Sequence, residues 1–144
     1  MKILVLNGPN LNLLGAREPE VYGDLHMEAL KDMVLARAGE LGVSADFRQT
    51  NSEDELIGWI HEAFEAGNAV VINPAAFTHY SYALRDACAA HTKAGNKLIE
   101  VHISNPHSRE EFRHNSVISG VATGVIAGFG FDSYLLALEQ LARN

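Results

Sequence analysis

Short apolar runs alternate along the chain with longer segments whose apolar residues recur at helical spacing. Residues 3–6 (Ile-Leu-Val-Leu) are apolar without interruption, which is typical of a strand buried on both faces of a sheet. Residues 43–49 alternate between apolar and polar, which favours a strand at a sheet edge. Together these patterns predict five strands, over residues 2–7, 43–49, 69–72, 97–102 and 123–127.

Helices are predicted in the intervals between these strands. Asp24 is expected to cap the first helix, and Gly42 is expected to end it. Ser52 and Glu55 form a capping-box pattern at the start of the second helix. A third helix is predicted over residues 81–93, and a last, leucine-rich helix follows the fifth strand.

Strands that alternate with helices at this spacing predict a three-layer α/β domain with a parallel sheet. The commonest small arrangement is the flavodoxin-like one, a five-stranded sheet with strand order 2-1-3-4-5. We expect residues 1–144 to form a single catalytic domain of this kind. Such folds bind ligands beyond the carboxyl ends of their strands, near the point where the strand order reverses. Functional residues should therefore follow the first, third and fourth strands.

The composition is that of an ordinary globular protein, with 47% hydrophobic and 20% charged residues. The net charge of −7 argues against a nucleic-acid partner, but local arginines can still bind a small anionic substrate. The one cysteine, Cys88, excludes an intrachain disulfide and favours a reducing compartment. The chain begins with a strand pattern instead of a secretory signal, and no apolar run approaches roughly 20 residues. We therefore expect a cytoplasmic protein with no membrane partner.

The loop that follows the first strand, residues 8–23, is far longer than the roughly 2–6 residues usual for such connections. It contains asparagines, Arg17 and Tyr22, which offer hydrogen bonds, a cation and a phenol to one cleft. An exposed loop of turn-forming residues is the plainer alternative. The length of the loop and its leucines favour a binding loop or lid.

The third and fourth strands also end in polar residues. Asn73 ends the third, at the mouth of the predicted switch point. Glu100 and His102 are two residues apart on the fourth strand, so their side chains share one face, where a glutamate can hold an imidazole in one tautomer. A solvated edge face is the alternative for this pair. A set of Tyr, Arg, Asn and a Glu-oriented His suits proton abstraction next to a carbonyl, followed by protonation of a leaving group.

Three blocks of sequence resemble those of type II 3-dehydroquinate dehydratases, and the resemblance covers essentially the whole chain. They begin with Asn-Gly-Pro-Asn-Leu-Asn-Leu-Leu-Gly at 7–15, and continue with Asn-Pro-Ala-Ala at 73–76 and Glu-Val-His-Ile-Ser-Asn at 100–105. The resemblance implies a flavodoxin-like fold assembled as a dodecamer of trimers. It also implies dehydration of 3-dehydroquinate to 3-dehydroshikimate in the shikimate pathway, by anti elimination through an enolate, with no metal, cofactor or Schiff base.

The resemblance further implies a role for individual residues. Tyr22 would be the base that removes the C2 proton, and Arg17 would support its ionised form. His102 would be the general acid for the departing C1 hydroxyl, with Glu100 orienting it, and Asn12 would stabilise the enolate. The substrate-contact positions would be Asn73, His79, Asp86, Ile103, Ser104 and Arg113. Asp86 would reach the site of a neighbouring subunit.

A flavodoxin-like binding or signalling module is the alternative to an enzyme. A receiver-type phosphoacceptor needs acidic residues at the ends of the first and third strands, where this chain has Asn7 and Asn73. A flavin or nucleotide site needs a loop rich in glycine and hydroxyl groups after the first strand, and this loop offers Asn, Leu and Arg instead. The residues therefore favour a catalytic cleft.

Overall fold

The computed structural model describes residues 1–15 and 26–143 of the chain. They form a five-stranded parallel sheet with strand order β2-β1-β3-β4-β5, which confirms the predicted topology. The strands are β1 (Lys2–Asn7), β2 (Ser44–Gln49), β3 (Ala69–Asn73), β4 (Leu98–His102) and β5 (Gly124–Ala127).

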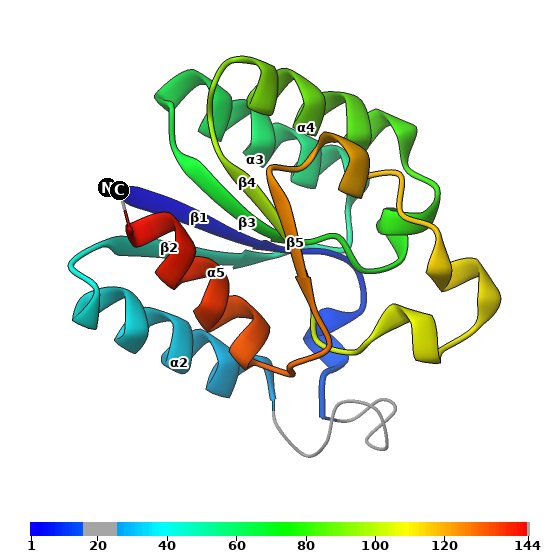
Figure 1. The fold of residues 1–144 in the computed structure, drawn as a ribbon, viewed down its shortest axis with the longest axis horizontal. Coiled ribbons are helices and arrows are strands. Elements are labelled where there is room, and N and C mark those ends of the chain that lie inside the picture. Colours follow the sequence, from blue (N-terminus) through cyan, green and yellow to red (C-terminus); the bar gives the residue numbers. More distant parts are fainter. Residues whose placement is uncertain (16–25, 144) are drawn as a thin grey trace.

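Helices cover both faces of the sheet (Figure 1). One face carries α2 (Met27–Glu40) and α5 (Asp132–Ala142), and the other carries α3 (Glu53–Ala66) and α4 (Tyr82–Lys93). Ile3 and Val5 pack into the core below α2 and α5, whereas Leu4 and Leu6 pack into the core below α3 and α4. The uninterrupted apolar run in β1 is thus explained, because successive side chains of a strand point to opposite faces.

The helix ends agree with the sequence in part. The Ser52 hydroxyl accepts a hydrogen bond from the backbone N–H of Glu55 at 3.1 Å, as a capping box requires. The N–H of Ser52, however, donates to the hydroxyl of Thr50 at 3.0 Å, so Glu55 does not complete the box. Gly42 follows α2 with φ of +74°, a conformation that favours glycine. Asp24, the predicted cap of α2, lies outside the described residues, and the helix begins directly after His26.

The carboxyl ends of β1 and β3 lie against each other. Asn7 and Asn73 are register partners, and the N–H of Gly8 donates to the carbonyl of Asn73 at 2.8 Å. A Cβ atom at Gly8 would lie 2.5 Å from the carbonyl oxygen of Pro74, so only glycine fits this approach. None of the helices among residues 1–15 and 26–143 combines the length and apolar character needed to span a membrane.

Candidate active site

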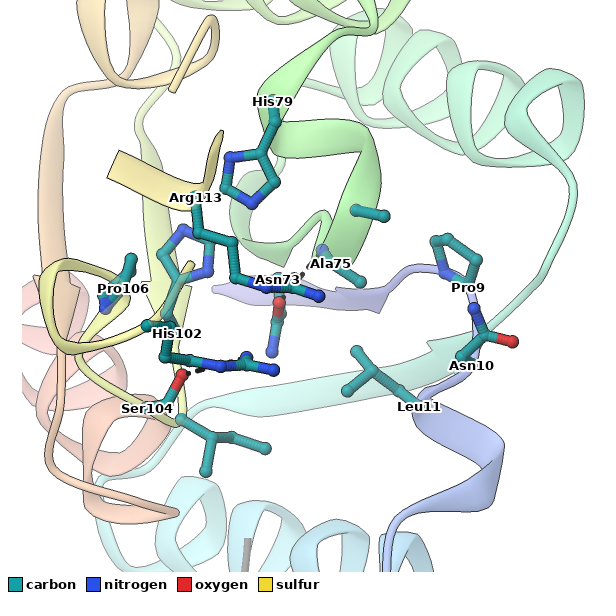
Figure 2. A pocket seen from close by; sticks show the side chains of 13 residues that line it. Pro9, Asn10, Leu11, Asn73, Ala75, His79, His102, Ser104, Pro106 and Arg113 are labelled. Carbon is teal, nitrogen blue, oxygen red and sulfur yellow. Dashed lines mark hydrogen bonds between the residues drawn. The ribbon is translucent and has the colours of Figure 1, made fainter. Parts of the chain in front are cut away.

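A cavity lies at the carboxyl ends of β1, β3 and β4, where the strand order predicts a ligand site (Figure 2). Its walls come from three segments that are far apart in the sequence. The first follows β1, the second follows β3 in a 3-10 helix (Ala75–His79), and the third follows β4. The lining residues are Pro9, Asn10, Leu11, Asn73, Ala75, Ala76, His79, His102, Ile103, Ser104, Pro106, Arg109 and Arg113.

His102, the last residue of β4, lines the cavity and is paired with Glu100 two residues earlier. The Nε2 atom of His102 lies 2.5 Å from Oε2 of Glu100. The Glu100 side chain, on β4, is buried, with 1% exposure. Because Nε2 is directed at the carboxylate, Nδ1 is the ring nitrogen left for a group in the cavity. The pairing expected from the sequence is therefore present, and the structure excludes a solvated edge face for Glu100.

Glu100 is ionised at neutral pH although it is buried. Burial alone would raise the pKa of its carboxyl group, but hydrogen bonds from His102, Ser119 and Ser116, together with the charge of His102, bring the pKa below its usual value. A buried carboxylate that accepts several hydrogen bonds keeps its charge and its orientation. This carboxylate can therefore hold the His102 ring in one orientation, as an acid–base histidine needs.

His79 faces the same cavity as a neutral imidazole. Its Nδ1 atom lies 2.8 Å from the backbone carbonyl of Asn115, and its ring meets the ring of Phe112 edge-on. Burial lowers the pKa of His79, and the nearby Arg113 and His102 lower it further. Since a carbonyl oxygen only accepts hydrogen bonds, Nδ1 carries the proton and Nε2 is an acceptor. His79 can therefore accept a hydrogen bond from a hydroxyl group in the cavity.

Two arginines supply positive charge to the cavity. Arg109 lies 3.4 Å from the hydroxyl of Ser104, and the Arg113 guanidinium donates to the carboxylate of Glu110 at 2.8 Å. Their side chains are only 12% and 15% exposed. Guanidinium groups remain charged at all relevant pH values, and the two share a single carboxylate, Glu110, so a net positive charge remains on this side of the cavity. Such a site suits a small anion. Sequence reasoning assigned no role to Arg109, which lies after the recognised block.

Asn73 is held by a chain of buried hydrogen bonds. Its Nδ2 donates to the hydroxyl of Tyr134 at 2.8 Å, and that hydroxyl donates to Oδ1 of Asn7 at 2.6 Å. Its Oδ1 accepts from the backbone N–H of Ala75 at 3.1 Å. One N–H of the Asn73 amide therefore remains for a ligand. Tyr134 was not foreseen, although a tyrosine on the buried face of a leucine-rich helix needs a polar partner.

The structure does not bring Asn12 together with His102. A 3-10 turn, Leu11–Leu13, follows Asn10 and buries Leu11 and Leu14, whereas Asn10 and Asn12 are both exposed. Asn12 lines a separate hollow beside α2. Asn10 lines the cavity instead, and it lies across the cavity from His102 (Figure 2). Asn10 has φ of +69°, a backbone conformation that asparagine tolerates better than most residues.

The other predicted site residues divide into three groups. Ile103 and Ser104 line the cavity together with Asn73, His79 and Arg113. Asp86 does not, because its side chain is 73% exposed on α4 and forms an ion pair with Arg85 at 2.8 Å. Arg17 and Tyr22 lie outside the described residues.

Two other types of chemistry find no support among residues 1–15 and 26–143. Within these ranges, no group of 3 or more His, Cys, Asp or Glu side chains could hold a metal ion. Cys88 is fully buried in α4, and burial raises the pKa of its thiol to about 12. A thiol of this kind is not a nucleophile at neutral pH.

Comparison with known proteins agrees with this fold. The family model "Dehydroquinase class II" matches residues 1–142. The 3-dehydroquinate dehydratase of Salinispora tropica is 55% identical over 144 residues, which are 100% of this chain and 99% of the relative. That of Kineococcus radiotolerans is 57% identical over 142 residues, 99% of this chain and 95% of the relative. The crystal structure of the type II dehydroquinase from Propionibacterium acnes superposes with a TM-score of 0.95, at 49% identity, over 99% of this chain and 97% of that one. By sequence and by fold, the chain belongs to the class II dehydroquinase family.

Proposed function

We propose that this chain converts 3-dehydroquinate to 3-dehydroshikimate and water, by anti elimination through an enolate, in the cavity that His102 lines. The dehydratase activity follows from membership of the family and from relatives that are named 3-dehydroquinate dehydratase. The observation that supports the proposed mechanism is the His102–Glu100 pair at the wall of a cationic cavity. An anionic, hydroxylated ketone is the class of substrate that this chemistry suits.

The reaction begins with removal of the C2 proton. We assign this step to Tyr22, with Arg17 supporting the phenolate, on the basis of the family resemblance. The electron pair of the C–H bond moves into the neighbouring ketone and forms an enolate, whose oxygen needs a hydrogen-bond donor. We assign that donor to Asn10, directly or through a water molecule, because Asn10 lines the cavity and Asn12 does not.

The second step breaks the bond between C1 and its hydroxyl oxygen. The enolate re-forms the ketone, its electrons form the double bond between C1 and C2, and the hydroxyl leaves as water with a proton from His102. The ionised Glu100 orients the His102 ring for this transfer. The phenol of Tyr22 then loses a proton and His102 gains one, so that the enzyme returns to its starting state.

The remaining cavity residues are proposed to bind the substrate. Backbone N–H groups at Ile103 and Ser104 would hold the carboxylate, next to the guanidinium of Arg109. His79, whose Nε2 is an acceptor, would bind a ring hydroxyl, and Arg113 would lie against the same ring. Asn73 would donate its remaining N–H.

The function is tested by an absorbance assay with 3-dehydroquinate. The product contains a double bond conjugated with the ketone, so turnover should produce a rising ultraviolet absorbance. We expect the same rate before and after exhaustive treatment with a chelator, because no metal takes part in the proposed steps. Borohydride added with substrate should leave the enzyme active, since no imine forms. An unchanged absorbance with substrate would contradict the activity, and inactivation by borohydride would contradict the enolate route.

We further propose a cytoplasmic homo-oligomer, a dodecamer built of trimers, in which Asp86 completes the site of a neighbouring subunit. The family resemblance and the high exposure of Asp86 on α4 support this. Mixing Asp86→Ala with His102→Ala subunits under exchange conditions should restore partial activity, because some sites then combine an intact His102 with an intact Asp86. Mass spectrometry verifies the exchange. Mixed assemblies that stay as inactive as the parent variants would contradict a shared site.

A further inference from the structure

Two serines that belong to none of the recognised sequence blocks bind the Glu100 carboxylate. The hydroxyl of Ser116 lies 3.2 Å and 3.1 Å from the two carboxylate oxygens, Oε1 and Oε2. The hydroxyl of Ser119 donates to Oε1 at 2.7 Å. With His102 on Oε2, the buried carboxylate has donors on both oxygens. Its orientation is therefore set by groups outside strand β4 as well as by His102.

The direction of the Ser116 proton follows from its other contacts. Its Oγ accepts hydrogen bonds from the backbone N–H groups of Ile118, at 3.1 Å, and Ser119, at 3.0 Å. A serine hydroxyl has two acceptor positions and one proton. Because the backbone occupies both acceptor positions, the proton is directed to Glu100. Ser116 is thus a donor whose orientation is fixed before any substrate binds.

The segment that carries Ser116 is itself anchored. The N–H of Val117 donates to the carbonyl of Thr78 at 2.8 Å, and the Ile118 side chain is fully buried. Ser119 begins a 3-10 helix, Ser119–Val121, which continues directly from this anchor. The backbone therefore fixes the positions of the two hydroxyl groups. Rotation of the carboxylate would break its hydrogen bonds to them, so these bonds restrict that rotation.

We propose that Ser116 is a positioning residue for the dehydration: with Ser119 it fixes the Glu100 carboxylate, which in turn holds His102 in the orientation needed to protonate the leaving hydroxyl. The inference rests on the proposed role of His102 as general acid. Ser116 does not line the cavity, so its effect should reach the reaction only through Glu100 and His102.

The pH dependence of kcat distinguishes this role from a merely structural one. Burial raises the pKa of Glu100, and the hydrogen bonds to its carboxylate lower it. Loss of the Ser116 hydrogen bond should therefore raise this pKa. The carboxylate would be protonated at higher pH, so the acid limb of kcat should move to higher pH. The other groups that face Glu100 are unchanged by the substitution; they are His102, Ser119, His79, Cys88, Arg113, His107 and His114.

The experiment compares Ser116→Ala with Ser116→Thr, which keeps the hydroxyl. We expect Ser116→Ala to lower kcat about tenfold, the typical effect of one hydrogen bond to a charged group, with KM little changed. Ser116→Thr should recover most of kcat and the original acid limb. Ser52→Ala is the matched control: it removes a serine hydroxyl that accepts from the backbone at the start of α3 and is not one of the described donors to Glu100. Its kcat and pH profile should equal those of the unmodified protein.

Combination with His102→Ala separates this inference from the proposed function. In that background Ser116→Ala should cause no further loss of kcat, because the residue through which it acts is gone. A full kcat and an unmoved acid limb in Ser116→Ala, alongside an impaired His102→Ala, would overturn the positioning role alone. Equal losses in Ser116→Ala and Ser116→Thr would also overturn it. Full activity in His102→Ala would overturn the proposed acid and this inference with it.

Discussion

Replacement of His102 by alanine is expected to lower kcat by about 10²–10⁴-fold, the range that a positioned general acid contributes. A hydroxyl group at C1 leaves as hydroxide unless a proton reaches it, and hydroxide is a poor leaving group. The Glu100 carboxylate would remain buried in this variant without the partner that lies 2.5 Å away. Steady-state kinetics with 3-dehydroquinate should show the loss mainly in kcat, since the cationic residues that bind the substrate remain.

The matched control for this experiment is His61→Ala. His61 is exposed on α3 and does not line the cavity, so its removal should leave kcat unchanged. Thermal unfolding of both variants monitors the fold. A His102→Ala enzyme that is folded and turns over within a few fold of the unmodified protein would show that another group protonates the leaving hydroxyl.

Removal of the Asn10 side chain is expected to lower kcat by about 10²–10³-fold, the effect of losing one donor to a developing oxyanion. Glycine is the suitable replacement, because Asn10 has φ of +69° and alanine would add strain at that backbone conformation. The same substitution at Asn12 should have little effect on kcat, because Asn12 lines a separate hollow. Steady-state kinetics of the two variants measure the difference.

This pair of variants decides between two assignments two residues apart. The sequence resemblance implies Asn12 as the donor to the enolate, whereas we propose Asn10 because it lines the cavity. A large loss in Asn12→Gly with a nearly unchanged Asn10→Gly would restore the first assignment. Substrate binding by both variants, measured by calorimetry, separates a catalytic loss from a failure to bind.

The topology of this protein is predictable because it depends on local patterns. Apolar runs such as residues 3–6 occur where a strand is covered on both faces, and the segments between them have helical periodicity. The reversal of strand order then identifies the edge of the sheet where ligands bind. The pairing of Glu100 with His102 was predictable for the same reason, because the period of a strand puts both on one side.

The remaining features depend on contacts that no local pattern specifies. Which asparagine after β1 lines the cavity depends on one 3-10 turn, which buries Leu11 and Leu14. The hydrogen bond between Ser116 and Glu100 joins residues 16 positions apart through an irregular segment. Neither apolar periodicity nor capping rules describe such segments, so the sequence alone predicts the region of the site better than its inner contacts.

The hydroxyl of Tyr134 has a consequence for the order of events in folding. It bridges Asn7 and Asn73, and its bond to Asn7 joins residues 127 positions apart. Closing a long loop costs more entropy than closing a short one, so this contact is favoured once the intervening elements have folded. A folding intermediate that has paired β1 with β3 but has not docked α5 would still lack the group that orients the Asn73 amide. The binding cavity should therefore be complete only after α5 has docked on the sheet.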